Sequence, residues 1–169
     1  MQERLVHLFE DHFGLAPSAV VGVAGDGSDR SYRRLLSDDG HSAIGAVGPD
    51  HEENRAFISF TRAFRTIGLP VPELYAVDAE NGVYLMEDLG DTTLFSALEE
   101  AREAEEEEFP ASMVGVYREV LGCLPRFQVE GHRVVDYAMA YPHAEFDRRS
   151  ITWDLNYFKY HFLKLAHVP

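Results

Sequence analysis

The chain has 169 residues, with 15 Lys or Arg against 29 Asp or Glu, so its formal net charge is −14. Such an acidic surface repels phosphate backbones, which argues against nucleic acid as a partner. Apolar residues make up 46% of the chain and Cys123 is its only cysteine. We therefore expect a globular domain with a sizeable core and exclude a disordered chain, a disulfide scaffold and a thiolate metal cluster.

The chain also lacks the sequence signals of membrane insertion and secretion. No apolar run reaches the roughly 18 residues of a membrane span, and the N-terminal residues lack the basic-then-apolar order of a signal peptide. These features predict a cytoplasmic protein that does not use a membrane as a partner. Among the 15 basic residues only Lys159 and Lys164 are lysines, so chemistry that requires an amine earlier in the chain has no side chain to supply it.

The first 47 residues predict one helix followed by three strands. Leu5, Leu8, Phe9 and Phe13 recur at helical spacing, and Gly14 ends the pattern. Strand-like segments then cover residues 19–24, 32–36 and 42–47, with glycine-containing turns between them. This order indicates a three-stranded antiparallel meander.

Residues 48–90 predict a second helix and two further strands. Phe57, Phe60 and Phe64 mark the helix, with acidic residues in its first turn and Gly68 at its end. Strands near residues 74–77 and 83–86 are joined by Asn81-Gly82, a strong hairpin signal. The fold class we expect is α+β, a five-stranded antiparallel sheet carrying helices.

Beyond Gly90 the pattern is helical. A Glu-rich stretch over residues 99–108 predicts a solvated helix end or loop, a helix over residues 114–124 ends at Pro125, and a last helix starts near residues 146–150. The last helix carries several aromatic side chains, which require burial. No element follows it, so we expect it to contact a further lobe or another chain.

A glycine-rich segment over residues 22–28 permits three interpretations. A Walker-type phosphate loop fails because Ser28 stands where lysine is required, and a dinucleotide fingerprint fails because Arg30 stands where the third glycine belongs. The third interpretation is the glycine hairpin of kinase-like folds, in which a strand–turn–strand unit covers the nucleotide phosphates. A plain glycine hairpin remains the alternative.

The strand at residues 83–86 runs directly into the acidic segment 87–91, which also contains Gly90. In kinase-like folds a strand of this kind ends in the hinge, where backbone groups pair with the edge of adenine. The alternative is an ordinary strand end, because many strands end in a similar sequence.

Taken together in chain order, five segments resemble the N-terminal half of aminoglycoside phosphotransferase-like kinases. The most similar branch is the bacterial kinases that act on N-acetylmuramate and N-acetylglucosamine. The segments are residues 25–34, 52–57, 68–73, 85–91 and 146–149. The resemblance implies a protein-kinase-like N-lobe over residues 1–90 with its hinge at 87–90, and an incomplete helical start of the C-lobe over residues 91–169.

The resemblance also implies a nucleotide-binding role for ten residues. These are Asp26, Gly27, Ser28, Asp29, Arg30, Ser31, Arg34, Met86, Glu87 and Leu89. The first six form the loop over the phosphates, Met86 lies at the back of the adenine pocket, and the Glu87 carbonyl and Leu89 amide pair with adenine. Glu53 takes the place of the helix carboxylate that normally pairs with a strand lysine.

The strand lysine itself is the clearest departure from the family pattern. The third strand, residues 42–47, contains no lysine, so the α- and β-phosphates lose a standard cationic partner. Arginines in or just after the loop could compensate, and strand alternation sends Arg33 and Arg34 to opposite faces. One hypothesis is that one of these two faces the nucleotide; the alternative is two solvated charges.

The catalytic elements of phosphoryl transfer are also absent from this sequence. A kinase-like catalytic loop has an asparagine five residues after its base aspartate. Here the residues five positions before Asn54, Asn81 and Asn156 are Pro49, Ala76 and Ile151. The Asp88-Leu89-Gly90 tripeptide only mimics the metal-binding motif, so we assign no catalytic and no metal-binding residue.

The function we expect is that of the nucleotide-binding lobe of an ATP-dependent small-molecule phosphotransferase. The intact protein would use ATP with Mg²⁺ and a small-molecule hydroxyl acceptor, most plausibly a sugar, while this chain alone is inactive. A non-catalytic kinase-like regulatory or scaffold module is the alternative, and an acidic partner-binding protein a third interpretation. A His-x-Asp motif in the gene after Pro169, with Asn five residues beyond the Asp, would distinguish the enzyme from the scaffold.

Overall fold

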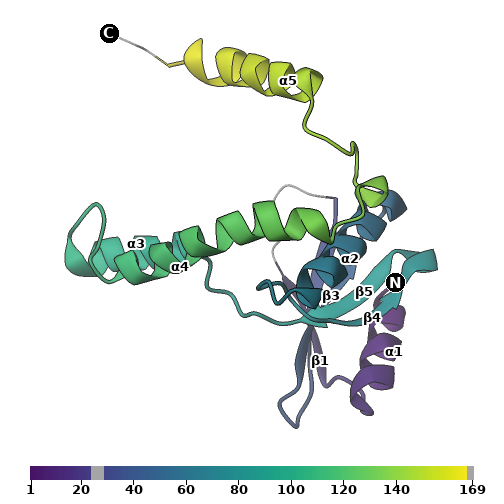
Figure 1. Cartoon of the computed structure of the whole chain (residues 1–169). Helices are drawn as coiled ribbons and strands as arrows, with labels where there is room; N and C mark the ends of the chain where they lie inside the picture. The colour runs from purple at the N-terminus through teal and green to yellow at the C-terminus, as the bar shows by residue number, and fades with distance from the viewer. Residues whose placement is uncertain (24–28, 167–169) are drawn as a thin grey trace.

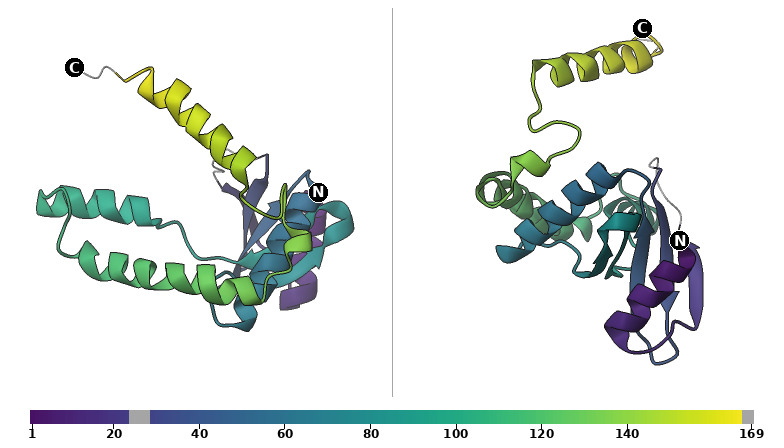
Figure 2. Two further views of the ribbon diagram at one scale, coloured as in Figure 1. Left: turned by 45° about the horizontal axis from the view of Figure 1, so that its top comes forward. Right: turned by 90° about the vertical axis from the view of Figure 1, so that its right-hand side faces the viewer.

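The computed structural model describes residues 1–23 and 29–166. Its fold is α+β, with a five-stranded antiparallel sheet in the order β1-β2-β3-β5-β4. The strands are β1 (Ala19–Val23), β2 (Ser31–Leu36), β3 (Ser42–Val47), β4 (Leu74–Asp78) and β5 (Val83–Glu87). Helices α1 (Gln2–Phe13) and α2 (His51–Thr66) lie on opposite faces of the sheet (Figures 1 and 2). The expected α+β class and the five-stranded antiparallel sheet are confirmed.

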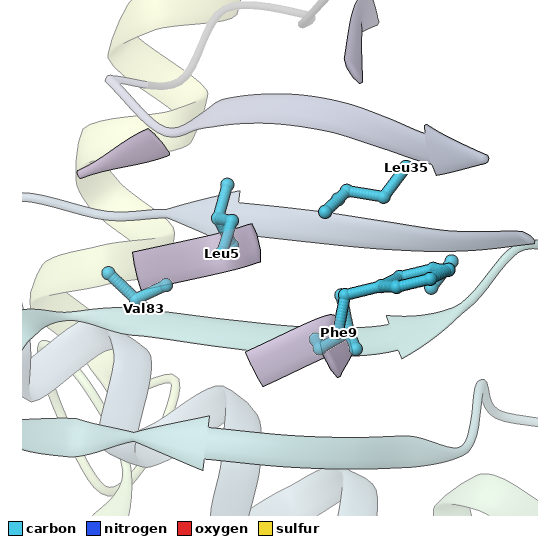
Figure 3. Close-up of a cluster of buried hydrophobic side chains, with 6 residues drawn as sticks. Leu5, Phe9, Leu35 and Val83 are labelled. Atoms are coloured by element: carbon cyan, nitrogen blue, oxygen red, sulfur yellow. The ribbon is translucent and has the colours of Figure 1, made fainter. Parts of the chain in front are cut away.

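Helix α1 covers one face of the sheet. Its predicted end is confirmed, because Gly14 caps it in the left-handed conformation, with φ 75°. Leu5 and Phe9 point from the helix onto the sheet and are fully buried, as Figure 3 shows. Leu35 and Val83 belong to the same cluster, so α1 is fixed to the strands by apolar burial.

Helix α2 covers the other face. Its N-cap is Asp50, whose carboxylate accepts hydrogen bonds from the backbone N–H groups of Glu52 (2.9 Å) and Glu53 (3.1 Å). Ile58 of α2 is buried against the sheet with Ala46 and Tyr84. The cap therefore fixes where α2 begins, and the apolar stripe fixes which side faces the strands.

The predicted hairpin between the last two strands is confirmed, with a longer connection than a two-residue turn. A short 3₁₀ turn, η1 (Ala79–Asn81), joins β4 to β5, and Gly82 follows with φ 65°. The Asp78 carboxylate accepts a hydrogen bond from the Asn81 amide nitrogen at 2.8 Å. This local bonding lets Asp78 extend β4 by one residue beyond the predicted end.

The remaining described residues are largely helical. Their elements are α3 (Leu94–Glu105), α4 (Met113–Pro125), η2 (Arg126–Glu130), η3 (Gly131–Arg133), η4 (Tyr137–Met139), α5 (Arg148–Phe158) and η5 (Lys159–Leu163). The Glu-rich stretch is confirmed as the solvent-facing end of α3 and an exposed loop.

The prediction that this helix ends at Pro125 is confirmed for the α-helix, because α4 covers Met113–Pro125. The chain continues through a π-helical turn, η2, in which the Gly131 N–H donates to the Arg126 carbonyl. Proline lacks the N–H of an α-helical hydrogen bond and its ring crowds the preceding turn. The α-helix therefore ends at Pro125, and a wider π-helical turn continues the helical path beyond it.

Helix α5 begins as predicted. The Asp147 carboxylate caps it by accepting a hydrogen bond from the Ser150 N–H at 2.9 Å. The helix projects away from the sheet in all three views of the ribbon (Figures 1 and 2). Trp153 is 66% exposed, which shows that its apolar surface lacks cover from the described residues. No helix within residues 1–23 and 29–166 has the length and apolar character needed to cross a bilayer.

Candidate functional site

The face of the sheet that α2 covers carries the residues of interest. Tyr32, Ala46 and Tyr84 pack there, and the β2–β3 register pairs Tyr32 with Ala46 and Arg34 with Ile44. Since side chains alternate along a strand, Arg30 and Arg34 point to the same side as Tyr32. Arg30, directly before β2, and Arg34 within it thus lie on one face.

One end of this face holds the described part of the predicted phosphate loop. Asp26, Gly27 and Ser28 lie outside the described residues. Asp29 and Ser31 are exposed, and Ser31 opens β2 opposite Val47. The structure thus places the last three residues of the predicted loop at the end of β2 nearest the start of α2.

Arg30 connects this end of the sheet to α2. Its Nη2 lies 2.7 Å from Glu53 Oε1, and its guanidinium lies 5.5 Å from the centre of the Phe57 ring. The Arg30 side chain is only 10% exposed. Burial lowers the pKa of Arg30, but hydrogen bonding with Tyr32 and nearby negative charge outweigh it and raise the pKa, so the group stays cationic.

The opposite end holds the predicted hinge. Met86 pairs with Ile44 on β3, and Glu87 ends β5 opposite Ala43. The Glu87 N–H donates to the Glu73 carbonyl at 2.8 Å, and the Glu87 carboxylate accepts from the Glu73 N–H at 3.0 Å. Leu89 is 69% exposed. Four steps along β3, from Ala43 to Val47, separate the two ends by ~13 Å.

Arg34 is bound at the hinge end. It donates to Asp88 through Nε (2.7 Å) and Nη2 (3.0 Å), and to Asp91 through Nη1 and Nη2 (both 2.8 Å). Ser42 also donates to the Asp88 carboxylate. Burial raises the pKa of Asp88, but hydrogen bonds from Arg34 and Ser42 outweigh it and leave the pKa below its ordinary value.

These contacts bear on the hypothesis that Arg33 or Arg34 faces the nucleotide. Arg34 lies on the α2 side, yet two carboxylates already bind its guanidinium, so it is not a solvated charge either. Arg33 pairs with Gly45 and points to the opposite face. Sequence reasoning did not anticipate the Arg30–Glu53 pair. The spacing of Arg30, Tyr32 and Arg34 at every second residue could have indicated only that these three side chains share a face.

The described residues supply no site for a metal ion. Within residues 1–23 and 29–166, no group of three or more His, Cys, Asp or Glu side chains is placed to hold one. Asp88, which sits in the metal-like tripeptide, accepts hydrogen bonds from Arg34, Ser42 and the Gly90 N–H. Its carboxylate therefore joins the segment after β5 to β2 and β3.

Comparison with known proteins gives two similar sequences. A protein of Pseudomonas aeruginosa named N-acetylmuramate/N-acetylglucosamine kinase is 29% identical over 113 residues, which cover 66% of this chain and 33% of that protein. A protein of the same name from Pseudomonas putida is 33% identical over 97 residues, covering 55% of this chain and 28% of that protein. No model of a known protein family matches the chain.

Both similar proteins are kinases by name, so the comparison supports a relationship to kinases. The chain spans about a third of the length of these curated relatives. The matched proteins are thus much longer than the sequence they share with this chain.

Proposed function

We propose that residues 1–90 are the nucleotide-binding N-lobe of a protein-kinase-like fold, with residues 87–90 as its hinge. Residues 91–169 then form the helical start of the C-lobe. The five-stranded sheet with α2 on one face and an acidic segment after β5 supports this division. The exposed apolar side chains of α5 support it too, because a larger lobe would cover them.

The intact protein would be an ATP-dependent phosphotransferase that acts on a hydroxyl group of a small molecule, most plausibly a sugar. The similarity to the two Pseudomonas sugar kinases carries this proposal. The geometry agrees with it, because a phosphate end and an adenine end lie ~13 Å apart on one face of the sheet. The acceptor would be selected mainly by residues outside this chain.

Two places among the described residues support the binding of ATP. Arg30 could hold phosphate oxygens, and the backbone near Leu89 could pair with adenine. Since no metal cluster is found among the described residues, we assign none of them to Mg²⁺. When bound, ATP would supply the transferable phosphoryl group, and the role of this chain is to bind and orient it.

Calorimetric titration with MgATP tests the proposal. We expect the 169-residue chain to bind, and Leu89→Pro to bind about 5- to 10-fold more weakly because it removes one N–H group. Leu89→Ala is the matched control, since it keeps the N–H and Leu89 is exposed. No binding by the unmodified chain would refute the nucleotide-binding lobe, and equal binding by both variants would refute the hinge assignment.

A second candidate is a kinase-like regulatory or scaffold module that does not transfer phosphate. The absence of lysine before position 159 favours it, because active kinase-like lobes use a strand lysine on the phosphates. Such a module could bind nucleotide or have lost binding altogether. Nucleotide binding that depends on Arg30 would argue for the enzyme.

A further inference from the structure

Arg30, in its ion pair with Glu53, is the best-placed cationic side chain at the end of the α2 face that holds the predicted phosphate loop. The salt bridge of 2.7 Å joins β2 to the first turn of α2, and Phe57 one turn later lies beneath the guanidinium. A carboxylate and an aromatic ring therefore fix one arginine side chain from two directions. This orientation restricts an otherwise flexible side chain, which lowers the entropic cost of binding an anion.

Strand β3 offers no cation at this end. Its side chains on the α2 face include Ile44 and Ala46, and Ala46 is fully buried between Tyr32 and Tyr84 of the neighbouring strands. The Tyr84 ring stacks on Phe57, with 5.2 Å between ring centres. Tyr84 thus occupies the space on the α2 face where a strand cation would otherwise lie. The positive charge near Glu53 is that of Arg30, directly before β2.

The two arginines within β2, Arg33 and Arg34, do not supply a cation at this end of the face. Arg34 lies at the hinge end and is bound by Asp88 and Asp91. Arg33 points to the opposite face. A guanidinium carries five N–H donors in a planar fork, a geometry that suits phosphate oxygens as well as carboxylates.

We infer that Arg30 binds the phosphate oxygens of the nucleotide in place of a strand lysine, and that Glu53 and Phe57 are positioning residues for its guanidinium. This inference rests on the proposed nucleotide-binding function. It predicts that binding of the phosphates depends on Arg30 and that binding of the base does not. The ratio of adenosine to ADP dissociation constants measures that dependence directly.

The experiment is calorimetric titration of the 169-residue chain with adenosine and with ADP at constant ionic strength. We expect the unmodified chain to prefer ADP, and Arg30→Ala to lose about 10- to 100-fold in ADP affinity with adenosine affinity unchanged. Arg30→Lys should recover part of that loss, since it restores the charge without the fork. Glu53→Gln should weaken ADP binding by several fold.

Arg33→Ala is the matched control, because it removes the same charge three residues further along the chain, on the other face of the sheet. Circular dichroism of each variant checks that it folds. If Arg30→Ala does not fold, the comparison of Arg30→Lys and Glu53→Gln with the unmodified chain decides the matter, and unchanged ADP affinity in both would overturn the inference.

Three further results contradict the inference, and they differ from one another. If Arg30→Ala binds ADP as the unmodified chain does, Arg30 does not contact phosphate. If it loses adenosine and ADP affinity equally, Arg30 only maintains the structure. If the unmodified chain binds neither compound, the proposed function is refuted, and this inference is refuted with it.

Discussion

Similar apolar side chains are buried in the sheet region, residues 1–90, and exposed in the helical region, residues 91–166. In the sheet region Leu5, Phe9 and Tyr84 are fully buried between a helix and the strands. In the helical region Trp153 and Phe162 of the last helical segment are 66% and 59% exposed. Helical periodicity therefore identifies an apolar face in both regions, but only the sheet region supplies the layer that buries it.

The largest expected effect is the difference in the free energy of unfolding between a Leu→Ala substitution in the sheet region and one in the helical region. Leu85→Ala removes a fully buried side chain from β5 and should cost about 2–5 kcal/mol of the free energy of unfolding. Leu155→Ala in α5, where the side chain is 63% exposed, should change it by less than about 0.5 kcal/mol. Urea denaturation followed by circular dichroism measures both, and equal losses would show that α5 is covered in solution.

A glycine substitution should have opposite signs in the two regions. Gly82 has φ 65° and a Cβ there would lie 2.5 Å from the Gly48 carbonyl oxygen, so Gly82→Ala should cost about 2 kcal/mol. Gly122 lies inside α4 with no atom within 4 Å of an added Cβ, so Gly122→Ala should stabilise that helix by up to about 1 kcal/mol. Thermal denaturation separates the two, and a loss of stability in Gly122→Ala would mean that α4 is packed on that side.

The Arg34–Asp88 contact, which lies inside the sheet region, should be sensitive to pH. The pKa of Asp88 in the folded chain lies below its ordinary value, so its contribution to stability is complete at neutral pH and is lost as the pH falls below about 4. Arg34→Ala should therefore cost about 1 kcal/mol at pH 7 and less at pH 3. Urea unfolding at the two pH values measures the difference, with Arg33→Ala as control. A cost that does not change with pH would show that the Arg34–Asp88 contact contributes nothing.

The smallest effect is spectroscopic. Trp153 is the single tryptophan of the chain and lies on the exposed face of α5. Its emission should respond strongly to acrylamide in the native chain and change little when urea unfolds the sheet region. A blue-shifted, protected tryptophan would mean that another copy of the chain or another segment covers α5.

The sequence predicts the sheet region well because each of its elements carries a local signal. Gly14 and Asp50 bound the helices, and the Asn81-Gly82 pair marks the hairpin. The path after Pro125 could not be predicted, since the choice between ending a helix and widening it depends on backbone hydrogen bonds such as that from Gly131 to Arg126.

The candidate site was predictable only in part for a similar reason. The residues of the proposed loop and hinge were suggested by local motifs, but the partners of Arg30 and Arg34 come from segments 23 or more positions away. Ion pairs between distant segments leave no pattern in a single sequence. The pairing of Arg30 with Glu53 emerges only when β2 and α2 are placed side by side.

Ala46 limits how this chain could change over evolution. It is fully buried, and the tyrosines on both neighbouring strands leave no room for a long side chain at that position. A single Ala46→Lys mutation would overpack the sheet, while trimming Tyr84 first would open a cavity. Moving the cation from the start of β2 to β3 would therefore require at least two substitutions, and the first of them would destabilise the sheet. A lineage that adopts one arrangement has no single-step route to the other.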